Sequence, residues 1–297
     1  MHTHRLYEMP AEKNIMKLKS LIWTLGWKSK PQVFGTKVVR FHLEEDGEVE
    51  YAKWQHPKDY FHPFAQNLVT QMRRYVKPGD TVLDIGAHTG DYSVPLALAA
   101  GAKGCVFAFE PNPYVFRVLE ENAKLNRTKA NLVPINAAVS DKNEQTEFCY
   151  SDPGFCNGGR FEGVSRWKHG HAYKLSVQCM RAQEYLQQNF PERMQNVSLI
   201  KIDTEGHELS VIESLQDLIR TNRPYIHAEM FRHLKEQQRQ ALVETLQSLR
   251  YNVHYADGHY SWEQGKELDR ANTMFERHYD VVAIPQEKAN KTLRTAA

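Results

Sequence analysis

Short apolar runs alternate with longer amphipathic stretches over most of this chain. The apolar runs are rich in β-branched and aromatic residues, as buried strands are; they cover residues 81–85, 105–109, 131–137, 197–202, 224–228 and 279–284. Helical periodicity appears between them, at 91–100, 114–125 and 235–249, and in a helix that buries Val211, Ile212, Leu215, Leu218 and Ile219. Strands separated by helices of about 10–15 residues are joined by right-handed crossovers. The pattern predicts an α/β fold with a doubly wound, mainly parallel sheet.

One segment interrupts this alternation. Residues 145–179 contain two strand-like runs around a polar, glycine-rich loop, with no helical stretch between them. Loops at the carboxyl ends of parallel strands carry much of the substrate specificity of such folds. We therefore expect an inserted β-hairpin, or flap, at 145–179.

The N-terminal region, residues 1–61, has a mixed pattern. Helical spacing is clear over 10–27, where Ile15, Leu18, Ile22 and Leu25 share one face and lysines surround it. An uncovered stripe of this size is unusual on a soluble monomer. We expect this helix to pack on the main domain, residues 62–297, or to join two copies of the chain as a homodimer. Its lysines would give weak, salt-sensitive adhesion to a membrane rather than stable insertion.

Composition and charge exclude several classes of protein. The 297 residues carry 38 Lys and Arg against 36 Asp and Glu, and this near balance gives no general attraction for nucleic acid. Hydrophobic residues make up 41% of the chain, which is enough for a folded core. The longest strongly apolar stretch, 94–102, falls far short of the roughly 20 residues that span a bilayer. Residues 1–20 do not resemble a secretory signal, and the 4 cysteines lack CxxC spacing, so we expect a cytoplasmic protein with reduced thiols.

The most informative segment follows the run at 81–85. Gly86 and Gly90 flank a tight turn into a helix, where glycines allow a ligand close to the backbone and amides at the helix start offer donors. The G-x-x-x-G spacing differs from the G-x-G-x-x-G of dinucleotide sites. Asp84 and Asp91 place negative charge where a diphosphate would lie, which favours a cationic or zwitterionic ligand such as S-adenosylmethionine. A turn with no ligand is the simpler alternative.

Two further strand ends complete an adenosyl pocket. Glu110 ends the second strand, and an acidic residue there can accept hydrogen bonds from both ribose hydroxyls of an adenosine. The small residues that follow the third strand leave room for adenine, whose edge Asn136 or Asp141 could hydrogen-bond.

A fourth cluster follows the strand at 197–202. Asp203 comes directly off the strand and should point into the cleft, where a base or metal ligand acts. His207 could be a general base near neutral pH or a solvated residue at a helix start, and we assign Glu208 mainly to capping that helix. His227 and Glu229 share one face of the next strand.

Together these blocks resemble the FkbM-type family of S-adenosylmethionine-dependent methyltransferases, within the Rossmann-like class I. The run 82–93 is similar to the first motif of that family, with His88 where asparagine is usual, and 109–111, 136–141 and 200–208 match later blocks in order. The resemblance covers about residues 64–285. It implies a seven-stranded sheet and methyl transfer, mostly to hydroxyl oxygens of sugars, polyketides and other small molecules. The full set of predicted cofactor contacts is Asp84, Gly86, Ala87, His88, Gly90, Tyr92, Ser93, Glu110, Pro111, Asn112, Asn136, Ala137 and Ala138.

We therefore predict an O-methyltransferase that uses S-adenosylmethionine, releases S-adenosylhomocysteine and acts on a small-molecule or carbohydrate acceptor. A hydroxyl would displace the sulfonium methyl in line, and the predicted catalytic residues are Asp203 first, then His207 and Glu229. A divalent cation held by Asp203, Glu229 and a histidine could instead acidify the hydroxyl; we do not expect it.

Three other functions stay open. A non-enzymatic binding or scaffold protein could keep the same cofactor residues. An N-methyltransferase usually carries an Asn/Asp-Pro-Pro-aromatic run after the fourth strand, where this chain has Asp-Thr-Glu-Gly. A nicotinamide-dependent dehydrogenase needs the denser glycine fingerprint and often a Tyr-x-x-x-Lys pair, neither of which this sequence contains.

Overall fold

The computed structural model describes residues 29–59, 61, 63–156, 158–159, 173–256 and 264–292. The helix expected over 10–27 and most of the glycine-rich loop of the flap lie outside these residues. Within the described part of the chain, no helix is both long enough and apolar enough to cross a membrane.

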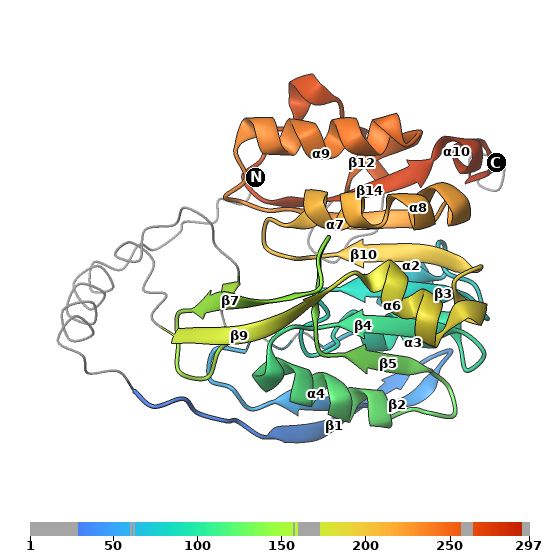
Figure 1. Cartoon of the computed structure of the whole chain (residues 1–297). Coiled ribbons are helices and arrows are strands. Elements are labelled where there is room, and N and C mark those ends of the chain that lie inside the picture. Colours follow the sequence, from blue (N-terminus) through green and yellow to red (C-terminus); the bar gives the residue numbers. More distant parts are fainter. Residues whose placement is uncertain are drawn as a thin grey trace, which may run out of the picture.

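A mainly parallel sheet forms the centre of the molecule (Figure 1). Among the described residues it has 8 strands in the order β13-β12-β14-β11-β10-β3-β4-β5. Their bounds are β3 Thr81–Ile85, β4 Cys105–Phe109, β5 Leu132–Ile135, β10 Val197–Ile202, β11 Tyr225–Met230, β12 Tyr251–Ala256, β13 Gln264–Glu267 and β14 Tyr279–Pro285. The strands from β11 to β5 pair in parallel, whereas β14 is antiparallel to both its neighbours and β13 is antiparallel to β12. This confirms the predicted fold class.

The apolar pattern did not single out β12 and β13, and β13 makes the sheet one strand wider than the seven expected. In β12, half-buried Asn252 and His254 alternate with buried Tyr251 and Val253. A strand near a sheet edge is covered less completely, so it does not need the continuous apolar run by which the central strands were found.

Helices cover both faces of the sheet. They are α2 Gln66–Met72, α3 Ser93–Ala100, α4 Pro113–Lys124, α6 Ala182–Asn189, α7 Glu208–Ser214, α8 Gln216–Asn222, α9 Glu236–Ser248 and α10 Gln286–Thr292, with short 3₁₀ turns at Pro191–Arg193 and Arg270–Asn272. One face of the sheet packs against α6 to α9, and the other packs against α2 and α3. The start of α4 shows a local cause: the Asn112 side chain accepts the Tyr114 N–H, and Pro113 needs no amide partner in the first turn.

A hairpin that the sequence pattern did not reveal packs beside α4 and the turn after β3. Strands β1 Thr36–Leu43 and β2 Gly47–Trp54 pair antiparallel. Asn122 of α4 binds both backbone groups of Ala52 and also donates to the Thr89 carbonyl. The Tyr51 hydroxyl lies 2.8 Å from that of Thr89. These contacts attach the N-terminal hairpin directly to the glycine turn.

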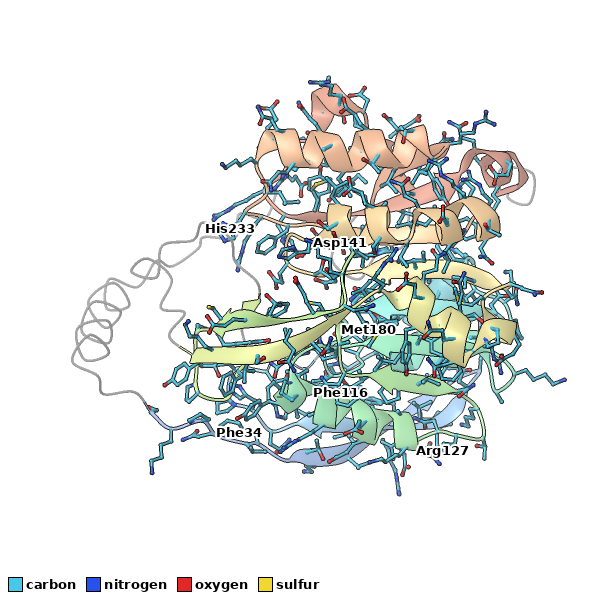
Figure 2. The ribbon with its side chains drawn as sticks, viewed as in Figure 1. Phe34, Phe116, Arg127, Asp141, Met180 and His233 are labelled. Atoms are coloured by element: carbon cyan, nitrogen blue, oxygen red, sulfur yellow. The ribbon has the colours of Figure 1, made fainter. Side chains whose placement is uncertain are left out.

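The flap is an antiparallel hairpin of β7 Glu144–Tyr150 and β9 Tyr173–Met180. In the described residues β6 Ala138–Val139 and β8 Gly158–Gly159 extend it to a sheet of 4 strands. Within this small sheet, the Ser140 N–H after β6 donates to the Met180 carbonyl of β9 at 2.9 Å, next to Asp141 (Figure 2).

Candidate active site

The glycine turn after β3 is held in place by two other strands. Gly86 has φ +81° and Gly90 has φ +93°, in the region that favours glycine. The amides of Gly86 and Ala87 both donate to the Phe109 carbonyl of β4 at 3.0 Å. On the other side, a Cβ added to Gly86 would lie 1.8 Å from the Asp203 carbonyl oxygen. The turn therefore lies directly against the loop that carries the predicted base.

His88 occupies the position where the family usually has asparagine. Its φ is +48°, a left-handed conformation that asparagine and histidine adopt more readily than most residues. The substitution therefore keeps the backbone requirement of the turn.

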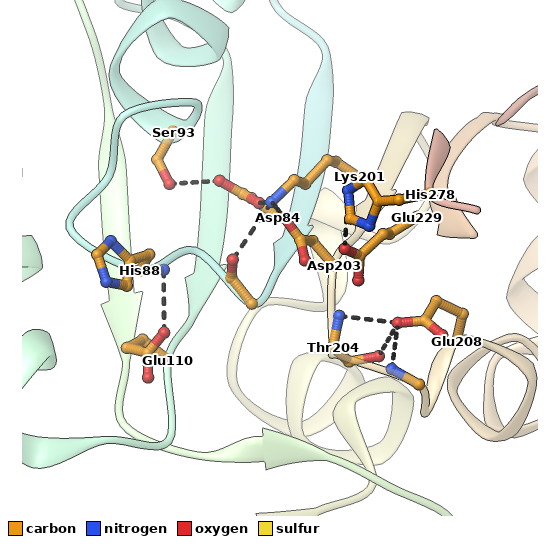
Figure 3. Close-up of polar contacts among 12 residues, drawn as sticks. Asp84, His88, Ser93, Glu110, Lys201, Asp203, Thr204, Glu208, Glu229 and His278 are labelled. Carbon is orange, nitrogen blue, oxygen red and sulfur yellow. Dashed lines mark hydrogen bonds and ion pairs between the residues drawn. The ribbon is translucent and has the colours of Figure 1, made fainter. Parts of the chain in front are cut away.

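Glu110 accepts two backbone hydrogen bonds at the end of β4. His88 N–H donates to Oε2 at 2.9 Å (Figure 3). Asn112 N–H donates to Oε1 at 2.8 Å. Asn136, after β5, donates to the Glu110 and Pro111 carbonyls at 2.8 and 3.2 Å. Burial raises the pKa of Glu110, and His88 and the two amides oppose that shift. Each carboxylate oxygen keeps a second lone pair for a hydroxyl donor.

Asp84 is buried beneath the turn and is bound on both sides. Its side chain is 0% exposed, Ser93 Oγ donates to Oδ2 at 2.5 Å, and Lys201 Nζ lies 3.5 Å from Oδ1. The Tyr92 ring lies 5.0 Å from the same ammonium. Asp84, Tyr92 and Ser93 thus form a support under the turn, and their predicted contact with the cofactor stays a prediction.

Sequence reasoning missed Lys201. Its ammonium lies 3.4 Å from Asp203 Oδ2, 3.5 Å from Asp84 Oδ1 and 3.3 Å from the Gly86 carbonyl oxygen (Figure 3). A lysine inside the apolar strand Val-Ser-Leu-Ile-Lys-Ile was the available signal, because lysine is almost never buried without a partner.

Asp203 and Glu229 form a carboxyl pair at the carboxyl ends of β10 and β11. The Asp203 side chain is 42% exposed, so it faces an open part of the site as expected. Desolvation opposes its ionisation, but the Lys201 ammonium outweighs that effect and lowers the pKa of Asp203. Burial and the Asp203 charge raise the pKa of Glu229 well above its usual range. The two shifts run in opposite directions, so they favour the charge on Asp203 and the proton on Glu229, whose carboxylic O–H can donate to Asp203.

The surroundings of Glu229 agree with a protonated acid. Its Oε1 lies 3.4 Å from His278 Nε2, and its buried Oε2 has no donor among the described residues. An ionised oxygen in that position would be costly, whereas a carboxylic O–H beside Asp203 has an acceptor.

The loop after Asp203 is closed by Glu208. Glu208 Oε1 accepts the Thr204 and Gly206 amides and the Thr204 hydroxyl, each at 3.0 Å. The predicted helix cap is therefore wrong in its partner: Glu208 lies in the first turn of α7 but binds the loop before it, and the N-cap of α7 makes no side-chain hydrogen bond. Between Thr204 and Gly206, Glu205 has φ +56°, and desolvation and the Asp203 charge raise its pKa to about 7.

The second candidate base, His207, lies at the N-terminal end of α7. Its carbonyl accepts the Val211 N–H.

The geometry can be tested for an adenosyl cofactor and for a metal. A close-approach turn and an oriented carboxylate at the next strand end fit an adenosine in extended form. At the third strand end Ala138 is half-buried, whereas Ala137 is 0% exposed in the core, which does not support its predicted contact with the cofactor. Over the described ranges, no group of at least 3 His, Cys, Asp or Glu residues is placed to hold a metal ion.

Residues 84–265 match the Methyltransferase FkbM domain. The chain belongs to the FkbM methyltransferase family. The methyl donor of this family is S-adenosylmethionine, in agreement with the fit of the site.

Other similarities are more distant. A tRNA(Phe) (4-demethylwyosine(37)-C(7)) aminocarboxypropyltransferase of Pyrococcus horikoshii is 30% identical over 141 residues, covering 46% of this chain and 48% of its own. A hexuronic acid methyltransferase, AglP, of Haloferax volcanii is 24% identical over 156 residues, covering 52% and 58%. The chain thus spans about half the length of these curated relatives. A solved FkbM methyltransferase of Methylobacillus flagellatus has 13% identity and a TM-score of 0.47, over 71% of this chain and 44% of that chain.

Proposed function

We propose that this protein is an S-adenosylmethionine-dependent methyltransferase that methylates a hydroxyl oxygen of a small molecule or carbohydrate. One observation carries the proposal: Asp203, 42% exposed and 3.4 Å from the Lys201 ammonium, follows a central strand, and its own carbonyl lies against the turn expected to bind the cofactor. Family membership supports methyl transfer, and the hexuronic acid methyltransferase supports a carbohydrate acceptor.

The proposed reaction needs little covalent chemistry from the protein. The cofactor supplies a methyl group on a sulfonium. Asp203 accepts a hydrogen bond from the acceptor hydroxyl and holds its oxygen in line, about 3 Å from the methyl carbon. As the O–C bond forms and the C–S bond breaks, the hydroxyl proton becomes strongly acidic and passes to Asp203. A carboxylate of low pKa is then a sufficient base.

Cofactor class can be tested by tryptophan fluorescence. The Trp54 ring lies 6.2 Å from that of His88 in the turn, so binding should change its emission. We expect S-adenosylhomocysteine, but not NADH, to quench the wild-type protein, with the signal lost in Trp54→Phe. Quenching by NADH alone would overturn the proposal.

Acceptor class can be tested with S-adenosylmethionine labelled in its methyl group. Uronic acid oligosaccharides, bulk tRNA and ribosomal protein would be offered in parallel, since relatives act on each kind. We expect label in the oligosaccharide, as an alkali-stable methyl ether. Label in tRNA or protein would replace the carbohydrate proposal, and the near-zero net charge gives no electrostatic reason to expect it in tRNA.

A further inference from the structure

Two polar rows cross the centre of an otherwise apolar sheet face. In the strand register, Lys201 is opposite Asp84 of β3 and His227 of β11. Side chains two residues apart share a face, so Asp203 and Glu229 form the next row towards the carboxyl ends. Deeper on this face lie the buried apolar residues Val82 and Leu199. The charged side chains are thus concentrated in the two rows nearest the carboxyl ends of the strands, next to the glycine turn.

Lys201 links these rows from the buried side. Its side chain is 5% exposed, Asp84 is 0% exposed and Asp203 is 42% exposed. The ammonium has three N–H donors, and three oxygens lie 3.3–3.5 Å from it: one from Asp84, one from Asp203 and the Gly86 carbonyl. Each comes from a different part of the site.

The balance of charge around Asp203 shows what this ammonium does. Two acids lie near Asp203, the buried Asp84 below it and Glu205 in its own loop, and burial together with the Asp203 charge raises the pKa of both. The acid Glu229 faces it from β11, and His88 faces it from the turn with an attractive effect smaller than that of Lys201. Lys201 lies between Asp84 and Asp203. Without it, these two carboxyl groups would be neighbours with no cation between them, and one member of such a pair normally takes up a proton.

We propose that Lys201 is a positioning residue for methyl transfer, a fixed cation that holds Asp203 ionised and in place while tying it to the Gly86 carbonyl of the cofactor turn. Its ammonium lies 3.4 Å from Asp203 Oδ2, so the chain itself supplies a positive charge to this carboxylate. The inference rests on the proposed function for its catalytic meaning, but the contact can be tested independently.

The test compares wild type with Lys201→Met, which keeps the length of the side chain and removes the charge, and with Lys201→Arg, which keeps the charge. Lys129→Met is the matched control, since Lys129 Nζ donates to the Asp46 and Glu48 carbonyls of the β1–β2 turn. The measurement is the pH titration of the Asp203 carboxyl carbon by NMR on protein labelled in aspartate, with the signal assigned by its loss in Asp203→Asn. The dissociation constant for S-adenosylhomocysteine is measured on each variant.

We expect the Asp203 titration midpoint to rise by about one pH unit or more in Lys201→Met, the usual effect of losing an adjacent opposite charge. It should return towards wild type in Lys201→Arg and stay unchanged in Lys129→Met. Affinity for S-adenosylhomocysteine should stay within several-fold. An equal midpoint in wild type and Lys201→Met overturns the inference.

Two other outcomes are also decisive. If Lys201→Met does not fold, Asp84→Asn/Lys201→Met removes the buried acid and the buried cation together, a change that proteins tolerate better than an unpaired charge. A smaller rise is expected there, because the acidic neighbour Asp84 is removed as well, so the midpoint is compared with that of Asp84→Asn alone. No rise against Asp84→Asn overturns the inference. If wild type fails to bind S-adenosylhomocysteine, the proposed function falls, while the titration still tests the Lys201–Asp203 contact.

Discussion

Carboxylates in this site differ in role according to what binds them. Asp84 and Glu208 are buried and hold neighbouring parts of the chain. Glu110 is oriented by two amides, and Asp203 is partly exposed and paired with a lysine. The first two should therefore affect stability when changed, and the last two should affect function.

Replacing Glu110 by alanine should weaken the binding of S-adenosylhomocysteine by about 1–3 kcal/mol, because charged acceptors of ribose hydroxyls make strong hydrogen bonds. Calorimetric titration measures the change. Glu213→Ala, on the exposed side of α7, is the control and should bind as wild type does. An unchanged dissociation constant in Glu110→Ala would remove Glu110 from the cofactor site.

Replacing Asp203 by asparagine should separate chemistry from binding. The amide cannot take the proton, so turnover of labelled methyl should fall by about a hundredfold or more. Cofactor affinity should stay within several-fold, as should both quantities in the control Asp217→Asn on the exposed side of α8. Preserved turnover with weakened binding would instead make Asp203 a cofactor residue and His207 the next candidate base.

At the scale of elements, strand ends and the turns between them define the site. The turn after β3 contacts β4 through Phe109 and the loop after β10 through Asp203. The position of the turn is thus fixed by its neighbours as well as by its own glycines. Its contact with the Asp203 carbonyl can be tested by adding one methyl group at Gly86.

Gly86→Ala should abolish binding of S-adenosylhomocysteine and lower the melting temperature clearly more than Gly79→Ala. Both glycines have positive φ, +81° and +96°, so both substitutions carry a backbone cost of about 1–2 kcal/mol. A Cβ at Gly79 meets nothing within 4 Å, whereas one at Gly86 meets the Asp203 carbonyl at 1.8 Å. Equal losses of stability in the two variants would show that this close approach is unimportant.

A second contact joins the N-terminal segment to the flap. His56 Nε2 lies 3.0 Å from Asp152 Oδ1, and both side chains are 4% exposed. Asp152 also accepts the Gly154 amide. Burial lowers the pKa of His56 below its ordinary 6.5, and the Asp152 carboxylate opposes that shift only in part.

This contact predicts a loss of stability in acid. The folded state binds a proton at His56 less readily than the unfolded state, so its contribution is complete above about pH 6.5 and is lost as the pH falls below that value. Between about pH 7 and pH 5, the free energy of unfolding should fall by about 1 kcal/mol more in wild type than in His56→Gln. Urea denaturation measures this, with the exposed His42→Gln as control. Parallel pH profiles in wild type and His56→Gln would contradict it.

At the scale of the whole molecule, one face of the sheet is an apolar core beneath α6 to α9, and the other carries the charged rows near its carboxyl edge. The hairpin β1–β2 is attached to α4 through Asn122, and the segment after β2 is attached to the flap through the contact of His56 with Asp152. The N-terminal region is therefore connected to the site. The homodimer and the cytoplasmic location stay predictions.

The proposed mechanism predicts that activity does not depend on a divalent metal ion. A chelator such as EDTA should leave transfer of labelled methyl unchanged, because Lys201 already places a positive charge 3.4 Å from Asp203 Oδ2. Washing with chelator, then adding back magnesium, measures this. Activity that is lost and then restored by magnesium would favour the cation mechanism instead.

The order of residues was sufficient to predict the fold class and the strand ends that carry the site. Long buried strands need continuous apolar runs, and a close-approach turn needs glycine, so both are visible in a single sequence. The positions of Asp84, Gly86, Glu110 and Asp203 follow from that local chemistry. By contrast, β12 and the β1–β2 hairpin have weak patterns because neighbouring elements supply part of their stability.

The partners of the charged groups were decided by tertiary structure. Lys201 contacts Asp84 and Gly86, which lie more than a hundred residues earlier in the sequence, and His278 contacts Glu229 from a separate segment. Which carboxyl group is ionised depends on these contacts, because burial and neighbouring charges set its pKa. Neither can be inferred from the spacing of residues in the sequence. Asp203 and Glu229 look alike in the sequence, and packing makes one an exposed carboxylate and the other a buried acid.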